Sequence, residues 1–314
     1  MKPKIIFFGT PHFALEILKE ISSLNYNVEA LVTAPDRPAG RGRKIKTFEI
    51  KQYAINNNIS IYQPYDLKDE EFINNLKKHR ANLFVVVAFR FIPKIIWSIP
   101  ELGTFNLHAS LLPDYRGAAP INWAIINREK ITGVTTFLID ENIDTGKILL
   151  TKKCDINSLD NYESLYNKLL ILAKELVLET IICLITKNIS PKKQKIIKKI
   201  NFAPKLNNQN TKINWMFPLN YIYSLIKGLS PYPGAWAILN DCNLKTRFKI
   251  LDCEIEYLNH KIDKNYILVE GKRIKILHKE GFLIIKSIQI ANKKILKSSE
   301  FLNGYTLKPT VFVE

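Results

Sequence analysis

Residues 83–88 read Leu83-Phe84-Val85-Val86-Val87-Ala88, a run without a polar side chain. The inner strands of parallel sheets are covered on both faces, so their sequences are continuously apolar. The run therefore predicts an inner strand of a parallel sheet. Strand patterns at Ile5–Phe8 and Val28–Thr33 flank a stretch whose apolar residues recur at helical spacing. Strands alternating with helices up to about residue 150 predict an open, doubly wound, Rossmann-like α/β sheet.

The sequence pattern changes after Pro204. Alternating segments such as Ile274–Leu277 and Phe282–Ile285 are typical of strands, and Gly271 and Gly281 suit tight turns between them. A set of such strands predicts a small antiparallel, OB-like β-barrel. We therefore expect three parts: an α/β domain over residues 1–189, a basic linker over 190–205 and a barrel domain over 206–314.

The chain is strongly basic, with a formal net charge of +17. One interpretation is compositional, because Lys, Asn and Ile are abundant together, as in proteins from A+T-rich genomes. The other interpretation is a polyanionic partner. Composition alone does not choose between the two.

Cysteine usage indicates a reducing compartment. The thiols form no CxxC pair and have no histidine at metal-ligand spacing, so neither a disulfide framework nor a metal site is expected. The chain shows no pattern of a cleaved leader and no apolar run of membrane-spanning length. These features predict a cytoplasmic protein that does not bind membranes. The cysteines are Cys154, Cys183, Cys242 and Cys253.

A group of polar residues follows the apolar strands. If residues 104–108 form a strand, Asn106 and His108 point to the same face. Ligands of doubly wound sheets bind beyond the carboxyl ends of the strands, which is where this pair would lie. Asp144 stands downstream, before Thr145 and Gly146. Each of the three has a structural interpretation: a strand-end amide, a buried histidine and a turn cap.

Together the three residues favour acyl or formyl transfer. That chemistry needs a hydrogen-bond donor for the developing oxyanion and a group that moves a proton near neutral pH. A nucleophilic Ser110 is the rival hypothesis, but the sequence has no GxSxG elbow. The turn Gly9-Thr10-Pro11 is not a GxGxxG motif, so we expect no NAD.

The motif Asn106-x-His108, continued by Ser110–Gly117 and followed by Asp144-Thr145-Gly146, resembles the formyltransferases that use 10-formyltetrahydrofolate. The resemblance extends over nearly the whole chain and is closest to the members that modify tRNA. Four further segments match that family: Phe8–Ala14, Pro35–Lys44, Gly117–Ile121 and Phe301–Tyr305.

The resemblance implies that the formyl group of 10-formyltetrahydrofolate passes to the α-amino group of methionine on initiator methionyl-tRNA. Asn106 would donate to the carbonyl oxygen as it becomes an oxyanion. His108 would act as a donor or a proton shuttle at the same carbon. Asp144 would set the charge and tautomer of His108, or hold a water. The family implies neither a metal nor a covalent enzyme intermediate.

The resemblance also implies two binding regions. Backbone groups of residues 89–92 would contact the pterin, although Phe89-Arg90 stands where many members have Tyr-Gly. A basic loop would contact the tRNA acceptor arm, and its structural alternative is a charged surface. The implied folate-binding residues are Phe89, Arg90, Phe91, Ile92, Ser110, Leu111, Leu112, Pro113 and Asp140. The implied tRNA-binding residues are Arg37, Arg41, Arg43, Lys44 and Lys46.

Two other functions fit parts of the sequence. A formyltransferase acting on a nucleotide sugar or on glycinamide ribonucleotide is disfavoured, since the single-domain purine enzymes lack a C-terminal barrel and the basic loop. A non-catalytic RNA-binding protein would not need Asn106, His108 and Asp144 together. The family resemblance favours a monomer.

Overall fold

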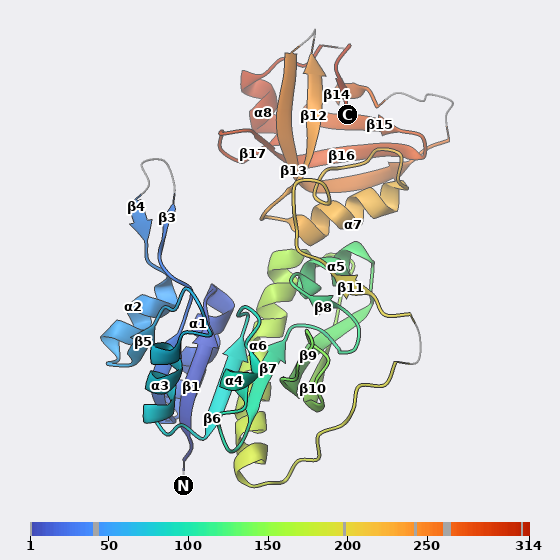
Figure 1. Cartoon of the computed structure of the whole chain (residues 1–314). Helices are drawn as coiled ribbons and strands as arrows, with labels where there is room; N and C mark the ends of the chain where they lie inside the picture. The colour runs from blue at the N-terminus through green and yellow to red at the C-terminus, as the bar shows by residue number, and fades with distance from the viewer. Residues whose placement is uncertain (1, 40–43, 197–198, 242–243, 260–264, 309) are drawn as a thin grey trace. The chain divides into compact units, whose positions relative to one another are not determined.

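The computed structural model of the chain forms two compact units (Figure 1). Unit 1 comprises residues 1–117, 131–155 and 167–202, and unit 2 comprises 118–130, 156–166 and 203–314. The structure describes residues 2–39, 44–196, 199–241, 244–259, 265–308 and 310–314. In these ranges, no helix combines the length and apolar character needed to cross a membrane.

Unit 1 is built on a seven-stranded sheet of order β10-β9-β7-β6-β1-β2-β5. The five strands from β7 to β5 are parallel, and β9 and β10 extend the sheet in antiparallel pairing. The predicted doubly wound α/β sheet is therefore confirmed, with a mixed edge beside β7. The strands are β1 Lys4–Gly9, β2 Asn27–Val32, β5 Ser60–Tyr62, β6 Leu83–Val87, β7 Thr104–His108, β9 Ile131–Leu138 and β10 Ile148–Asp155.

Helices cover both faces of this sheet (Figure 1). Ile6 and Phe8 of β1 pack with Phe72 of α3 in one apolar core. Ile5 and Phe7 alternate to the other face, where α1 contacts the inner strands. The helices are α1 His12–Ser23, α2 Glu49–Asn56, α3 Glu70–Lys78, α4 Lys94–Trp97 and α6 Tyr162–Ile185, of which unit 1 holds the part from residue 167. Short strands complete this part of the chain: β3 Arg37–Ala39, β4 Lys44–Lys46, β8 Arg116–Gly117 and β11 Phe202–Ala203.

Polar contacts attach α6 to the rest of unit 1. Lys174 Nζ lies 2.9 Å from Glu16 Oε2 of α1, and Lys19 Nζ lies 2.8 Å from Glu16 Oε1. These ammonium groups, Lys19 foremost, lower the pKa of the Glu16 carboxyl to about 2. Beneath the helix, the Thr180 hydroxyl lies 2.8 Å from the Thr136 hydroxyl of β9, and both side chains are buried.

Unit 2 contains an antiparallel sheet of order β14-β15-β16-β13-β12-β18, with β17 paired to β16. A bridge between Tyr266 and Phe312 brings the two ends of this strand order together. The predicted antiparallel C-terminal domain is therefore confirmed. Its elements are α5 Pro120–Ile126, α7 Leu219–Leu229, β12 Ala235–Asp241, β13 Leu244–Tyr257, β14 Ile267–Glu270, β15 Arg273–His278, β16 Gly281–Ile290, β17 Leu296–Lys297, α8 Ser298–Gly304 and β18 Phe312–Val313.

Both predicted turn glycines of unit 2 stand where a side chain would be costly. Gly271 lies between β14 and β15 with φ +60°. Gly281 begins β16, and a Cβ there would lie 2.1 Å from the Glu256 carbonyl oxygen of β13. Gly271 is thus required by backbone conformation, and Gly281 by the close approach of two strands.

We predict that Thr180→Val destabilises unit 1. The Thr180 hydroxyl donates to the Leu176 carbonyl, which leaves its oxygen to accept from Thr136. The substitution leaves the buried Thr136 hydroxyl without an acceptor, which costs about 1–3 kcal/mol of the free energy of unfolding. Urea unfolding followed by circular dichroism measures this loss.

Thr186→Val is the matched control for this prediction. The exposed Thr186 hydroxyl makes the same bond to the carbonyl four residues earlier, that of Ile182. Because water replaces that bond, the control changes the free energy of unfolding by no more than about 0.5 kcal/mol. Equal losses in the two variants would contradict the role assigned to the Thr136–Thr180 pair.

Candidate active site

Strand β7 places Asn106 and His108 on one face at its carboxyl end. Asn106 pairs with Val86 of β6 on one side and Phe137 of β9 on the other, and His108 pairs with Thr135 of β9. The predicted strand has the expected bounds. His108 is 7% exposed, whereas Asn106 is partly exposed. The two polar groups therefore stand side by side at the edge where the parallel strands end.

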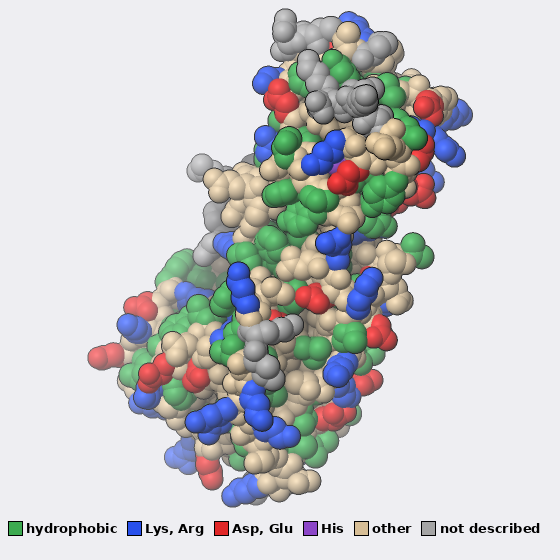
Figure 2. All heavy atoms as spheres, turned by 90° about the vertical axis from the view of Figure 1, so that its right-hand side faces the viewer, with side chains coloured by type: hydrophobic (Ala, Val, Ile, Leu, Met, Phe, Trp, Pro, Cys, Tyr) green, Lys and Arg blue, Asp and Glu red, His purple; other side chains and the backbone are tan. Residues whose placement is uncertain are grey.

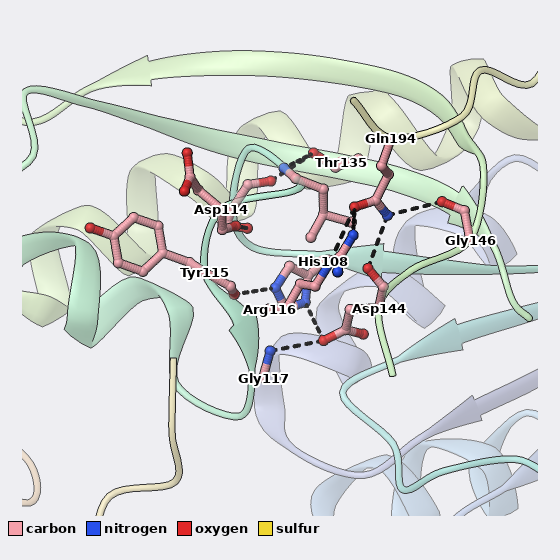
Figure 3. A network of polar contacts seen from close by, with 11 residues as sticks. His108, Asp114, Tyr115, Arg116, Gly117, Thr135, Asp144, Gly146 and Gln194 are labelled. Atoms are coloured by element: carbon pink, nitrogen blue, oxygen red, sulfur yellow. Dashed lines mark hydrogen bonds and ion pairs between the residues drawn. The ribbon is translucent and has the colours of Figure 1, made fainter. Parts of the chain in front are cut away.

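The His108 ring is held on both sides (Figure 3). Its Nε2 lies 2.8 Å from the Tyr115 carbonyl oxygen, and its Nδ1 lies 3.9 Å from Asp144 Oδ2. A carbonyl oxygen only accepts hydrogen bonds, so Nε2 carries a proton and donates it. In the neutral ring, Nδ1 is then the acceptor nitrogen, and it faces a carboxylate. A proton taken up at Nδ1 would complete an ion pair with Asp144.

Asp144 occupies a turn that the surrounding chain defines closely. Its Oδ2 accepts a 2.9 Å hydrogen bond from the Gly117 amide, and its backbone has φ +55°. Asp140 Oδ1 accepts from the Asn142 amide and from the Thr145 hydroxyl, which folds residues 140–145 back on themselves. A Cβ on Gly146 would lie 1.6 Å from the Leu138 carbonyl oxygen, so the turn is pressed against β9.

Asn106 has an unused acceptor. Among the described residues, its buried Oδ1 has no hydrogen-bond partner. Leaving such an atom unpaired costs about 1–3 kcal/mol, and orphaned polar groups of this kind gather at functional sites. The Asn106 carboxamide therefore keeps one acceptor that no described residue uses.

The side chains of residues 89–92, which follow β6, differ in their contacts and exposure. Phe89 packs edge-on against Phe8, with ring centroids 5.7 Å apart, and Ile92 is buried in the same core. The Arg90 guanidinium donates to the carbonyls of Pro64 and Tyr65, at 2.5 and 2.9 Å. Phe91 is 55% exposed. Of the four residues implied as folate contacts here, Phe91 alone combines large apolar area with high exposure.

The segment 110–113 is largely internal. The Ser110 hydroxyl is fully buried and donates to the Asp114 carbonyl at 2.7 Å, which argues against a nucleophilic role. Leu112 is buried, and its amide donates to the Thr135 hydroxyl. Leu111 packs at Gly133 of β9, where an added Cβ would lie 2.6 Å from its Cδ2. Leu111 and Pro113 are partly exposed. This segment supports the loop that carries Tyr115.

The basic loop is a hairpin whose tip lies outside the described residues. Strands β3 and β4 pair antiparallel, with Arg37 opposite Lys46 and Ala39 opposite Lys44. The predicted tRNA contacts Arg41 and Arg43 fall in residues 40–43, which the structure does not describe.

A charged residue anchors the base of this hairpin. Asp36 Oδ2 lies 2.5 Å from Lys51 Nζ, and its Oδ1 accepts from the Gln63 amide. These contacts, Lys51 foremost, hold the pKa of the Asp36 carboxyl below its usual range. On the face drawn in Figure 2, Lys and Arg side chains alternate with Asp and Glu instead of forming one basic patch. Net charge alone therefore does not locate an RNA surface.

Sequence reasoning missed Gln194, a member of the polar network in Figure 3. Gln194 donates to the Asp144 and Gly146 carbonyls, each at 2.9 Å, and accepts from the Arg116 guanidinium. Fifty residues separate Gln194 from Asp144, and no local motif marks it among the surrounding lysines.

Among the described residues, no group of three His, Cys, Asp or Glu side chains is placed to hold a metal ion.

Comparison with known proteins agrees with this fold. Residues 3–181 match the formyl transferase family model, and residues 205–306 match that of the formyl transferase C-terminal domain. A methionyl-tRNA formyltransferase from Flavobacterium johnsoniae is 47% identical over 97% of both chains. One from Bacteroides thetaiotaomicron is 42% identical over 97% of this chain and 96% of its own.

A solved structure shows the same fold at lower identity. It is the N-formyltransferase from Helicobacter canadensis, in complex with folinic acid and dTDP-3-aminofucose. It is 23% identical, has a TM-score of 0.62 and aligns over 91% of this chain and 98% of its own. With both family models matched and near-full-length relatives above 40% identity, the chain belongs to the formyl transferase family.

Proposed function

We propose that this chain transfers the formyl group of 10-formyltetrahydrofolate to the α-amino group of methionine on initiator methionyl-tRNA. The product is N-formylmethionyl-tRNA for translation initiation. The observation that carries the proposal is 47% identity to a methionyl-tRNA formyltransferase over 97% of both chains. The arrangement of Asn106, His108 and Asp144 supports it, because each has a place in an amide-forming transfer.

The reaction exchanges one C–N bond for another. The α-amine of the methionyl ester attacks the formyl carbon, the bond from that carbon to N10 of the folate breaks, and the proton lost by the amine ends on N10. Negative charge develops on the formyl oxygen during the attack. The Asn106 Nδ2 group donates to that oxygen and stabilises the charge that develops there.

His108 and Asp144 handle the proton. With Nε2–H donating to the Tyr115 carbonyl, Nδ1 is the nitrogen that accepts a proton released by the amine. Asp144, 3.9 Å away, stabilises the imidazolium that forms and stays in place through its bond from Gly117. The Tyr115 carbonyl therefore sets the tautomer of His108, and Asp144 stabilises the positive charge on its ring.

We place the folate in the crevice bounded by residues 89–92 and 139–144. The exposed Phe91 ring offers apolar surface for a flat pterin, and backbone groups of this segment supply hydrogen bonds. Asp140 would act by shaping the loop, since Asn142 and Thr145 already use its Oδ1. A bond from the Ser110 hydroxyl to the folate would compete with its bond to Asp114.

We assign tRNA contacts to the hairpin bearing Arg37, Arg41, Arg43, Lys44 and Lys46, and further tRNA contacts to unit 2. A cationic loop at the active edge of the sheet would meet phosphates of the acceptor arm. The Asp36–Lys51 contact fixes where the hairpin leaves the body of unit 1. The lysines of the basic linker 190–205 would also contact tRNA phosphates.

A direct assay tests the proposed function. The purified chain receives 10-formyltetrahydrofolate and one of three acceptors: charged initiator tRNA, charged elongator tRNA or a nucleotide-linked amino sugar. We expect formylation of the initiator species at a rate far above that of the other two. Formylation of the amino sugar but not of the initiator tRNA would refute the proposal.

Asn106→Ala is predicted to slow the chemical step. Removal of one oxyanion donor lowers kcat by about 10² to 10³, while the KM for tRNA changes little because Asn106 makes no phosphate contact in this proposal. Asn106→Asp loses as much, since a carboxylate repels the oxyanion. Single-turnover kinetics measure both variants. A raised KM with an unchanged rate of chemistry would contradict the assignment.

Arg41→Ala and Arg43→Ala are predicted to weaken tRNA use and leave the chemical step intact. Each lost phosphate contact raises the KM for tRNA and lowers the slope of log KM against log salt by about 1. Measurements of kcat and KM at several salt concentrations test this. Lys68→Ala, an exposed lysine before α3, is the control and keeps the wild-type slope. Identical salt slopes in all four proteins would exclude the loop from tRNA binding.

A further inference from the structure

Gln194 joins two loops that are far apart in the sequence. Its Nε2 donates to the carbonyls of Asp144 and Gly146, both at 2.9 Å. Its Oε1 accepts from Arg116 Nε at 3.2 Å and from the terminal Arg116 nitrogen at 2.6 Å. The carboxamide thus uses both donor hydrogens and both acceptor lone pairs. Every hydrogen-bonding position of the side chain goes to one of these loops.

These two loops supply the two groups that hold His108 (Figure 3). Tyr115, next to Arg116, provides the carbonyl at Nε2, and Asp144 provides the carboxylate at Nδ1. Gly117, on the other side of Arg116, donates to that same carboxylate. A shift between the two loops would therefore change the His108 contacts on both ring nitrogens at once.

The Asp144 turn needs an external support of this kind. A residue with a side chain at φ +55° is uncommon, and such conformations persist when neighbouring contacts define them. Gln194 bonds to the carbonyl of Asp144 itself and to that of Gly146. The Gly146 contact with the Leu138 carbonyl fixes the turn from the opposite side.

The segment that carries Gln194 is itself attached to the sheet. Lys192 and Ile148 exchange two backbone hydrogen bonds, of 2.8 and 2.9 Å, at the start of β10. Gln194 is partly buried two residues later, between the exposed Lys193 and Lys195. The lysine-rich stretch 187–196 is thus attached to unit 1 by the Lys192–Ile148 bonds and by the partly buried Gln194 side chain.

We propose that Gln194 is a positioning residue for His108 and Asp144. It holds the 115–117 and 144–146 loops in register, so that the two His108 nitrogens keep their separate partners. This role rests on the proposed function for its kinetic consequence, although the geometry of His108 is measurable without turnover.

Two substitutions test the role of Gln194. Gln194→Leu removes every bond to both loops, while Gln194→Glu keeps an acceptor for Arg116 but turns an oxygen toward the Asp144 and Gly146 carbonyls. We expect kcat to fall at least tenfold in both variants, with KM for tRNA and for formyl-folate within about threefold of wild type. The matched control is Gln52→Leu. The exposed Gln52 amide donates to Asn56 on α2, and we expect its loss to leave kcat and both KM values unchanged.

A second measurement needs no reaction. In histidine-labelled protein, ring nitrogen and carbon resonances of His108 should shift in Gln194→Leu and stay unchanged in Gln52→Leu, at equal thermal stability of the folded variants. Unchanged His108 resonances, or a raised KM at unchanged kcat, would overturn the positioning role. Failure of the wild-type chain to formylate charged tRNA defeats the proposed function instead, so the two failures are distinguishable.

Discussion

The contact on which the site depends is the hydrogen bond from His108 Nε2 to the Tyr115 carbonyl oxygen. It commits one nitrogen to the backbone and leaves the other for chemistry beside Asp144. The bond forms only if the loop after β7 turns back over the strand that carries His108. Ser110 and Thr135 keep that loop in place through internal hydrogen bonds, from the Ser110 hydroxyl to the Asp114 carbonyl and from the Thr135 hydroxyl to the Ser110 carbonyl.

The sheet supplies the second constraint. Strand β7 lies between parallel β6 and antiparallel β9, so the loop after β6 leaves at the carboxyl end of β7, whereas the end of β9 lies opposite Phe105, near the start of β7. The β6 loop offers backbone and the exposed Phe91, and the residues after β9 bring Asp144. Asn106 stands between them with an unsatisfied oxygen. Rigid hydrogen-bonded neighbours around one open amide are what a preorganised transfer site requires.

Sequence patterns predicted the elements better than the links between them. The apolar run at 83–87 and the strand 104–108 follow from local composition and spacing, and so does the shared face of Asn106 and His108. Gln194 could not be predicted in this way, because its partners lie 50 and 78 residues away and its neighbours are lysines that indicate a solvated linker. Burial also separates residues that look alike in sequence: Phe91 is exposed while Ile92 is in the core.

The most direct test of this account is the tautomer of His108. Two-bond proton–nitrogen correlation spectra of histidine-labelled protein, with His108 assigned through His108→Gln, report which ring nitrogen carries the proton when the ring is neutral. We expect a proton on Nε2, bonded to the Tyr115 carbonyl, and an unprotonated Nδ1 facing Asp144. A neutral ring protonated on Nδ1 would contradict it.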